Sequence, residues 1–156
     1  MYDETFMREA IKLSRHCIEK NAGGPFGVVI VRNGVEVGRG YNMVTINNDP
    51  TAHAEIVAIR DACKNLNTFK LDDCEIYTSC EPCPMCFGAI YWARIKKIYY
   101  AADRFDAEKA GFDDSFIYKE FDLSDNRRSI PAEQHCKQEA VKVFCEWEKL
   151  ATRVDY

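Results

Sequence analysis

The fold of this chain is decided by two short stretches, His53-Ala54-Glu55 and Pro82-Cys83-Pro84-Met85-Cys86. Together they supply one imidazole, two thiols and one further carboxylate. Structural zinc sites usually have four protein ligands, whereas catalytic sites have three and keep the fourth position for water or hydroxide. The ligand count therefore predicts one catalytic Zn²⁺ per chain, held by His53, Cys83 and Cys86, with Glu55 as the group that carries protons.

The spacing within each stretch predicts where these side chains lie. Cys83 and Cys86 are three residues apart and share a face on a helix, and Pro84 suits the first turn of that helix. His53 and Glu55 are two apart and can serve one site only at a helix end, which Pro50 predicts for a helix over residues 51–65. Helix N-termini carry free N–H groups and partial positive charge, which favour thiolates. We therefore predict that two helix N-termini meet at the zinc site.

Two alternatives share part of this pattern. Cys80 extends the run to Cys80-x-x-Cys83-x-x-Cys86, but the fourth cysteine of a ferredoxin cluster would fall near position 90, which is Ile90. A structural zinc site with Cys80 as fourth ligand is the stronger alternative, although it gives Glu55 no role. The paired pattern His-x-Glu and Pro-Cys-x-x-Cys is the signature of zinc deaminases, and it favours catalysis.

Length and composition limit the class of protein. The chain has 156 residues, 47% of them hydrophobic and 29% charged, which suits a single globular domain over residues 1–156. The net charge of −4 makes nucleic acid an improbable partner. The acidic start lacks the features of a signal peptide, and no apolar run reaches the roughly 20 residues of a membrane span. We therefore expect the chain in the reducing cytoplasm, where its eight cysteines serve as metal ligands, catalysts or small buried side chains.

Hydrophobic periodicity predicts alternating strands and helices. The dipeptide Asn33-Gly34 predicts a hairpin, because both central residues of a type I′ turn need positive φ. A strand, a helix and a strand in succession around the cysteine motif indicate a parallel crossover. The predicted helices cover residues 3–20, 51–65, 83–93, 113–121 and 139–151, and the predicted strands cover 28–31, 35–41, 74–78, 98–102 and, at an edge, 129–134.

Over residues 4–102 the chain resembles the cytidine deaminase superfamily, and within it the chain is similar to guanine deaminases. The resemblance is weak over residues 126–153. It is carried by these strings: Gly23-Gly24-Pro25-Phe26-Gly27, Asn47-Asn48-Asp49-Pro50-Thr51-Ala52-His53-Ala54-Glu55, Tyr77-Thr78-Ser79-Cys80-Glu81-Pro82-Cys83-Pro84-Met85-Cys86, Gly88-Ala89-Ile90-Tyr91-Trp92-Ala93-Arg94 and Ala110-Gly111-Phe112-Asp113-Asp114-Ser115-Phe116-Ile117-Tyr118.

The resemblance implies a three-layer α/β/α fold with a central five-stranded mixed sheet, and hydrolysis of guanine to xanthine and ammonia. It also implies a homodimer in which the C-terminal segment crosses to the partner. Further site residues follow from it: Asn42 and the Ala54 backbone as purine contacts, Phe26 and Trp92 as walls for the base, Asp114 as an acid at the guanine edge, and Tyr156 as a residue that closes the pocket of the other subunit.

Three other functions stay open on the sequence alone. The same chemistry would serve guanosine, cytosine or an aminotriazine. A tRNA adenosine deaminase shares the metal motif, although the net charge and the Asp113-Asp114 string argue against it. A non-catalytic zinc module is the remaining alternative.

Overall fold

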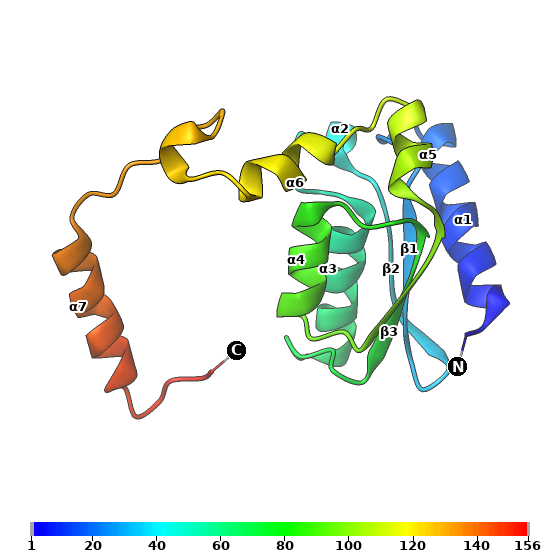
Figure 1. Cartoon of the computed structure of the whole chain (residues 1–156). Coiled ribbons are helices and arrows are strands. Elements are labelled where there is room, and N and C mark those ends of the chain that lie inside the picture. The colour runs from blue at the N-terminus through cyan, green and yellow to red at the C-terminus, as the bar shows by residue number, and fades with distance from the viewer. Residues whose placement is uncertain (1, 156) are drawn as a thin grey trace. The chain divides into compact units, whose positions relative to one another are not determined.

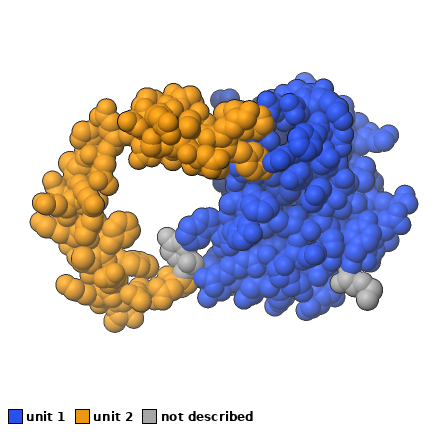
Figure 2. Space-filling model, viewed as in Figure 1, with its two compact units in different colours: residues 1–114 blue, residues 115–156 orange. Residues whose placement is uncertain are grey.

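A computed structural model of the chain describes residues 2–155, so Tyr156 lies outside the described residues. The chain divides into two compact units, residues 1–114 and residues 115–156 (Figure 2). The first unit holds both sequence stretches that decide the fold, and we describe the two units separately. No helix among the described residues is long and apolar enough to cross a membrane.

The first unit is built on a mixed four-stranded sheet with the strand order β2-β1-β3-β4 (Figure 1). β1 is antiparallel to both β2 and β3, whereas β3 and β4 are parallel. The predicted hairpin is confirmed, since Asn33 and Gly34 have φ of 52° and 76° between β1 and β2. The strands are β1 (Gly27–Arg32), β2 (Val35–Tyr41), β3 (Cys74–Cys80) and β4 (Lys97–Ala102).

Helices cover both faces of this sheet, which confirms the three-layer α/β/α architecture (Figure 1). Alternate residues of β1 point to opposite faces. Val29 and Val31 pack with α1 (Glu4–Glu19), and Val28 and Ile30 pack with α3 (Ala54–Leu66) and α4 (Pro84–Trp92). α4 connects β3 to β4, so the predicted parallel crossover is also confirmed. The three-layer arrangement places the N-termini of α3 and α4 on the same side of the sheet.

The predicted fifth strand over residues 129–134 is wrong, because the structure shows irregular backbone there. Pro131 has no N–H to give to a strand ladder, and its neighbours are mostly polar. Ile130 is 82% exposed and contributes nothing to a core. The sheet of the described chain therefore has four strands, not five.

Two short helices of the first unit were not predicted. α2 (Val44–Asn47) lies in the expected loop, and α5 (Arg104–Lys109) follows β4. The second unit contains α6 (Ser115–Phe121), a 3₁₀ turn (Asp125–Arg127) and α7 (Lys137–Glu148). None of its described residues is buried, although α7 carries an apolar stripe.

Gly40 keeps β2 in close contact with the start of α3, and this contact gives a testable prediction. A Cβ at Gly40 would lie 2.5 Å from the Ala54 carbonyl oxygen and 2.6 Å from the Ala58 amide nitrogen. Backbone atoms cannot move away cheaply, so we expect Gly40→Ala to lower the free energy of unfolding by about 1–3 kcal/mol in urea titrations. Gly88→Ala is the control, since a Cβ there meets nothing within 4 Å. Equal midpoints for Gly40→Ala and the wild type would contradict this close packing.

Candidate metal centre

The N-terminus of α3 places His53 and Glu55 together. His53 is the N-cap residue, with extended backbone, and Glu55 is the second residue of the helix. The sequence predicted that this helix begins at residue 51, directly after Pro50, but it begins at Ala54. Asp49 accepts hydrogen bonds from both the N–H and the hydroxyl of Thr51, and this turn delays the helix until Ala54. The predicted position of both side chains at a helix end is nevertheless confirmed.

The N-terminus of α4 positions the two thiols. Cys83 is its N-cap residue, Pro84 is the first helical residue, and Cys86 lies one turn further on. Cys86 is fully buried and Cys83 is partly exposed. The two cysteines share the end of the helix, where backbone N–H groups have no partners inside the helix. This local geometry agrees with the spacing argument made from the sequence.

The two helix ends bring three ligand atoms into one cluster. The ligand atoms of His53, Cys83 and Cys86 all lie within 4.8 Å of one another. Nδ1 of His53 is 3.5 Å from each sulfur. Around a tetrahedral zinc ion, with Zn–S of about 2.3 Å and Zn–N of about 2.0–2.1 Å, sulfur and nitrogen ligands lie about 3.5 Å apart. The donor set and its spacing therefore fit zinc, with Nδ1 as the imidazole ligand.

The charges of these three side chains are coupled. A hydrogen bond from Cys86, with a second from His53, lowers the pKa of the Cys83 thiol to about 4. The hydrogen bond with Cys83, together with burial, raises the pKa of the Cys86 thiol. The hydrogen bond with Cys83 raises the pKa of His53. Without a metal, these three side chains thus retain protons that a divalent cation would displace on binding.

Glu55 lies beside this cluster but outside its three-atom set. It is only 6% exposed, and its carboxyl group hydrogen-bonds with the Cys86 thiol. Burial raises its pKa, and the negative charge of Cys83 adds to the effect. A buried carboxyl group with a raised pKa is suited to take up and return protons.

Cys80 does not join the cluster in the described chain. Its thiol instead contacts the Asp103 carbonyl oxygen at 3.6 Å. Burial raises the pKa of the Cys80 thiol to about 11, which opposes formation of a ligating thiolate. This geometry argues against a closed site with Cys80 as fourth ligand.

Several residues predicted to contact the substrate lie near the cluster. Asn42 is buried directly after β2, and the next residue, Met43, bonds to the Ala52 carbonyl beside His53. Ala54 is buried as the first residue of α3. Asp114 is partly buried, and burial, with the negative charge of Cys83 nearby, raises its pKa. Ala54 thus adjoins His53 and Asp114 lies near Cys83, whereas Asn42 is linked to this end of α3 through the bond of Met43 to Ala52.

The structure pairs one predicted site residue with an aromatic ring that the sequence argument did not name. Phe26 was predicted as a wall, and Phe112 meets it edge-on with ring centroids 5.0 Å apart. Phe112 had no predicted role, although it lies in the string that carries the resemblance. Its position two residues before Asp114 was the available signal.

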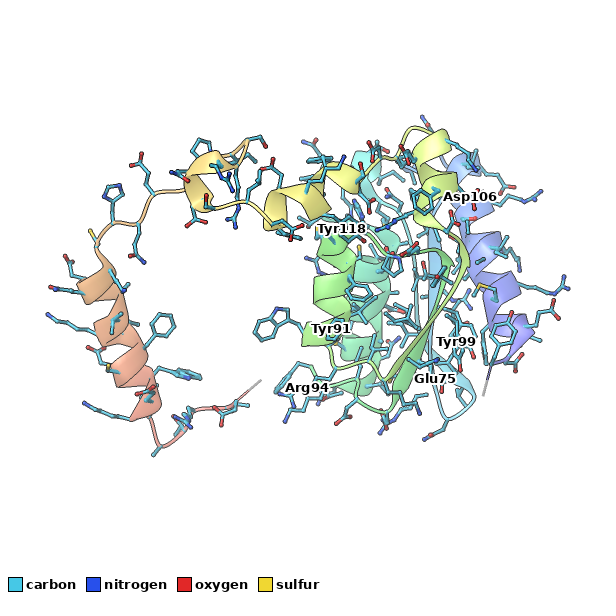
Figure 3. The ribbon with its side chains drawn as sticks, viewed as in Figure 1. Glu75, Tyr91, Arg94, Tyr99, Asp106 and Tyr118 are labelled. Atoms are coloured by element: carbon cyan, nitrogen blue, oxygen red, sulfur yellow. The ribbon has the colours of Figure 1, made fainter. Side chains whose placement is uncertain are left out.

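Trp92 is not brought to this site in the described chain, and Tyr156 lies outside the described residues. Trp92 is the last residue of α4 and is 70% exposed. It lies six positions after Cys86 along the helix, which corresponds to a rise of about 9 Å along the helix axis. Figure 3 labels its neighbours Tyr91 and Arg94 at that far end of the helix. The role of Trp92 as a wall stays a prediction, and so does that of Tyr156.

Comparison with known proteins agrees with this geometry. Residues 1–102 match the zinc-binding region of cytidine and deoxycytidylate deaminases. The chain is 53% identical to a guanine deaminase of Bacillus subtilis over 156 residues, which is the whole of both chains. The crystal structure of guanine deaminase from that organism superposes with a TM-score of 0.96 at 52% identity, covering 100% of this chain and 99% of the other.

A second group of relatives matches a shorter part of the chain. A tRNA-specific adenosine deaminase of Aquifex aeolicus is 40% identical over 102 residues, covering 65% of this chain and 67% of the relative. The shared part includes the zinc motif. The match with the Bacillus subtilis protein extends further, to the end of the chain.

Proposed function

The chain belongs to the family defined by the cytidine and deoxycytidylate deaminase zinc-binding region, and on that premise we propose that it hydrolyses guanine to xanthine and ammonia. The observation that carries the proposal is the set of three ligands, His53, Cys83 and Cys86, with the buried carboxyl group of Glu55 beside it. Full-length similarity to a guanine deaminase supports guanine as the substrate.

His53, Cys83 and Cys86 would hold one Zn²⁺ per chain, and water or hydroxide would be the fourth ligand. When bound, zinc supplies Lewis acidity that lowers the pKa of a coordinated water towards about 7. The N–H groups at the start of α4 lie beside both sulfurs and offset part of the thiolate charge. The protein residues then perform the proton transfers and hold the substrate.

Glu55 moves the protons of the reaction. It accepts a proton from the water that adds to C2 of guanine and gives one to ring N3. It then takes the proton of the hydroxyl group now on C2 and delivers it to the exocyclic nitrogen, so that ammonia leaves as the C2 carbonyl forms. Burial of Glu55 keeps bulk water from competing for these protons.

The neighbours of the metal cluster orient the purine. The Asn42 amide and the Ala54 backbone supply hydrogen bonds to the ring, and Phe26 covers one of its faces. Asp114 assists at the amino-bearing edge, where its raised pKa suits a shared proton. Because these groups are fixed in the fold, they position C2 against the nucleophile before reaction.

A substrate panel tests the proposal. We expect purified full-length protein to release ammonia from guanine, and to do so much faster than from guanosine, cytosine or an aminotriazine. Inosine formation in tRNA without turnover of guanine would favour the adenosine deaminase reading. A zinc-loaded protein that releases ammonia from none of these compounds would contradict the proposed function.

We further propose that the protein is a homodimer whose C-terminal segment covers the partner. Exposed apolar surfaces support this arrangement. In the first unit, α4 exposes Phe87, Tyr91 and Trp92. In the second unit, the apolar stripe of α7 is also exposed, and it consists of Val143, Phe144 and Trp147, with Leu150 exposed just after the helix. Surfaces of this kind on a small protein mark interaction sites.

A charge on the apolar stripe should separate the subunits. We expect Trp147→Asp to shift the molar mass by light scattering from dimer to monomer and to lower guanine turnover, if Tyr156 completes the partner's pocket. Lys142→Asp is the control, because it places the same carboxylate on the opposite face of α7. A monomeric wild type with full activity would contradict the dimer.

We also infer a cytoplasmic location. All eight cysteines are free thiols in the structure, which is the state expected in a reducing compartment.

A further inference from the structure

Cys17 is a buried thiol that the proposed chemistry does not use. It lies near the C-terminal end of α1 and is fully buried. Its sulfur is 3.0 Å from the Gly24 carbonyl oxygen and 3.1 Å from the Asn42 carbonyl oxygen. One side chain thus ties α1 to the loop before β1 and to the residue that follows β2.

Asn42 is held on three further sides. Its backbone N–H donates to the Phe26 carbonyl at 3.1 Å, and its Oδ1 accepts from the Val44 N–H at 3.1 Å. Gly23 packs directly against the amide group, because a Cβ there would lie 2.1 Å from Oδ1 of Asn42. The carbonyl half of the amide is therefore fixed by the protein, and the NH₂ half can turn to a ligand as a donor.

We propose that Cys17 is a positioning residue for substrate binding, acting through Asn42. This inference rests on the proposed function, in which Asn42 contacts the purine. The thiol fixes the backbone of Asn42 from the α1 side while Gly23 confines its side chain from the loop. The same thiol holds Gly24, which packs against both Phe26 and Phe112. Cys17 therefore links the polar contact for the base to its aromatic wall.

Cys17→Ala is the direct test, with Cys63→Ala as the control. Cys63 is a partly buried thiol towards the far end of α3. We expect Cys17→Ala to raise KM for guanine about two- to tenfold, the value of one lost hydrogen bond, with kcat and zinc content nearly unchanged. Cys17→Ser keeps a donor and should restore most of the KM. Cys63→Ala should leave both constants at wild-type values.

A double-mutant cycle separates positioning from a general loss of structure. In an Asn42→Ala background, Cys17→Ala should change KM little further, because the amide side chain that the thiol positions is then absent. Should Cys17→Ala fail to fold, Gly23→Ala disturbs the same amide from the loop side and is expected to raise KM in the same way. An unchanged KM in the variant that folds, or an equal effect in the Asn42→Ala background, would overturn the inference. Wild type that releases no ammonia from guanine would instead contradict the proposed function.

Discussion

Replacing Glu55 by Gln is expected to lower kcat for guanine by about 10²–10⁴-fold, the usual contribution of a positioned acid and base. The substitution keeps the size and most hydrogen bonds of the side chain but removes its titratable proton. Since Glu55 is buried beside Cys86 and is not one of the three clustered ligands, zinc content should stay at one per chain. The measurement is ammonia release at saturating guanine, together with metal analysis of the same sample.

Asp114→Asn provides a matched comparison for this prediction. It makes the same change of acid to amide at a carboxyl group that is less buried. Because Asp114 assists the reaction and does not carry both protons, we expect a smaller loss of kcat than for Glu55→Gln. Near-normal turnover by Glu55→Gln would rule out Glu55 as the proton carrier, and loss of zinc from that variant would make it a structural residue.

The sequence predicts the metal cluster well because the spacing inside each half is local, and the donor types of the two halves complete one metal-binding signature. Cys83, Pro84 and Cys86 specify a helix start by themselves, and His53 and Glu55 do so with little help from the rest of the chain. Pro50 misleads because the Asp49 side chain closes a competing turn at Thr51. That turn is a side-chain effect, and propensity for the first helical turn does not report it.

Elements without a strong apolar pattern are where prediction fails. The proposed strand over residues 129–134 has only Ile130 as a large apolar residue, and Pro131 follows it. α5 is missed because it is short and has no buried residue, although Asp103 and Asp106 form a capping box that marks its start. In both cases the hydrophobic period is too short to decide the structure.

Contacts between distant segments that share no motif could not be predicted from the sequence. The Cys17 thiol contacts the carbonyl oxygen of Asn42, which lies 25 residues further along the sequence. Phe26, early in the sequence of the first unit, contacts Phe112, near its end. The spacing of these residues does not predict either contact, because tertiary packing of α1 and of the chain after α5 creates them. The resemblance named Asn42 and Phe26, but the contacts that hold them in place came from the structure alone.

The second large effect is expected at Cys86, with Cys80 as its control. Cys86→Ala removes one of three ligands, so zinc content should fall far below one per chain and guanine turnover should be lost with it. Cys80→Ala removes a buried thiol at the end of β3 that contacts Asp103 instead of the cluster, and it should keep both zinc and activity. Metal analysis and ammonia release are measured on both variants.

The stability of the two variants gives an independent measurement. Zinc that binds only the folded state raises the melting temperature, so chelation should lower Tm in the wild type and in Cys80→Ala but have little effect in Cys86→Ala. If Cys80→Ala lost its zinc as Cys86→Ala does, the site would have four protein ligands. A fourth protein ligand would leave no position for a reacting water, and hydrolysis at this centre would be excluded.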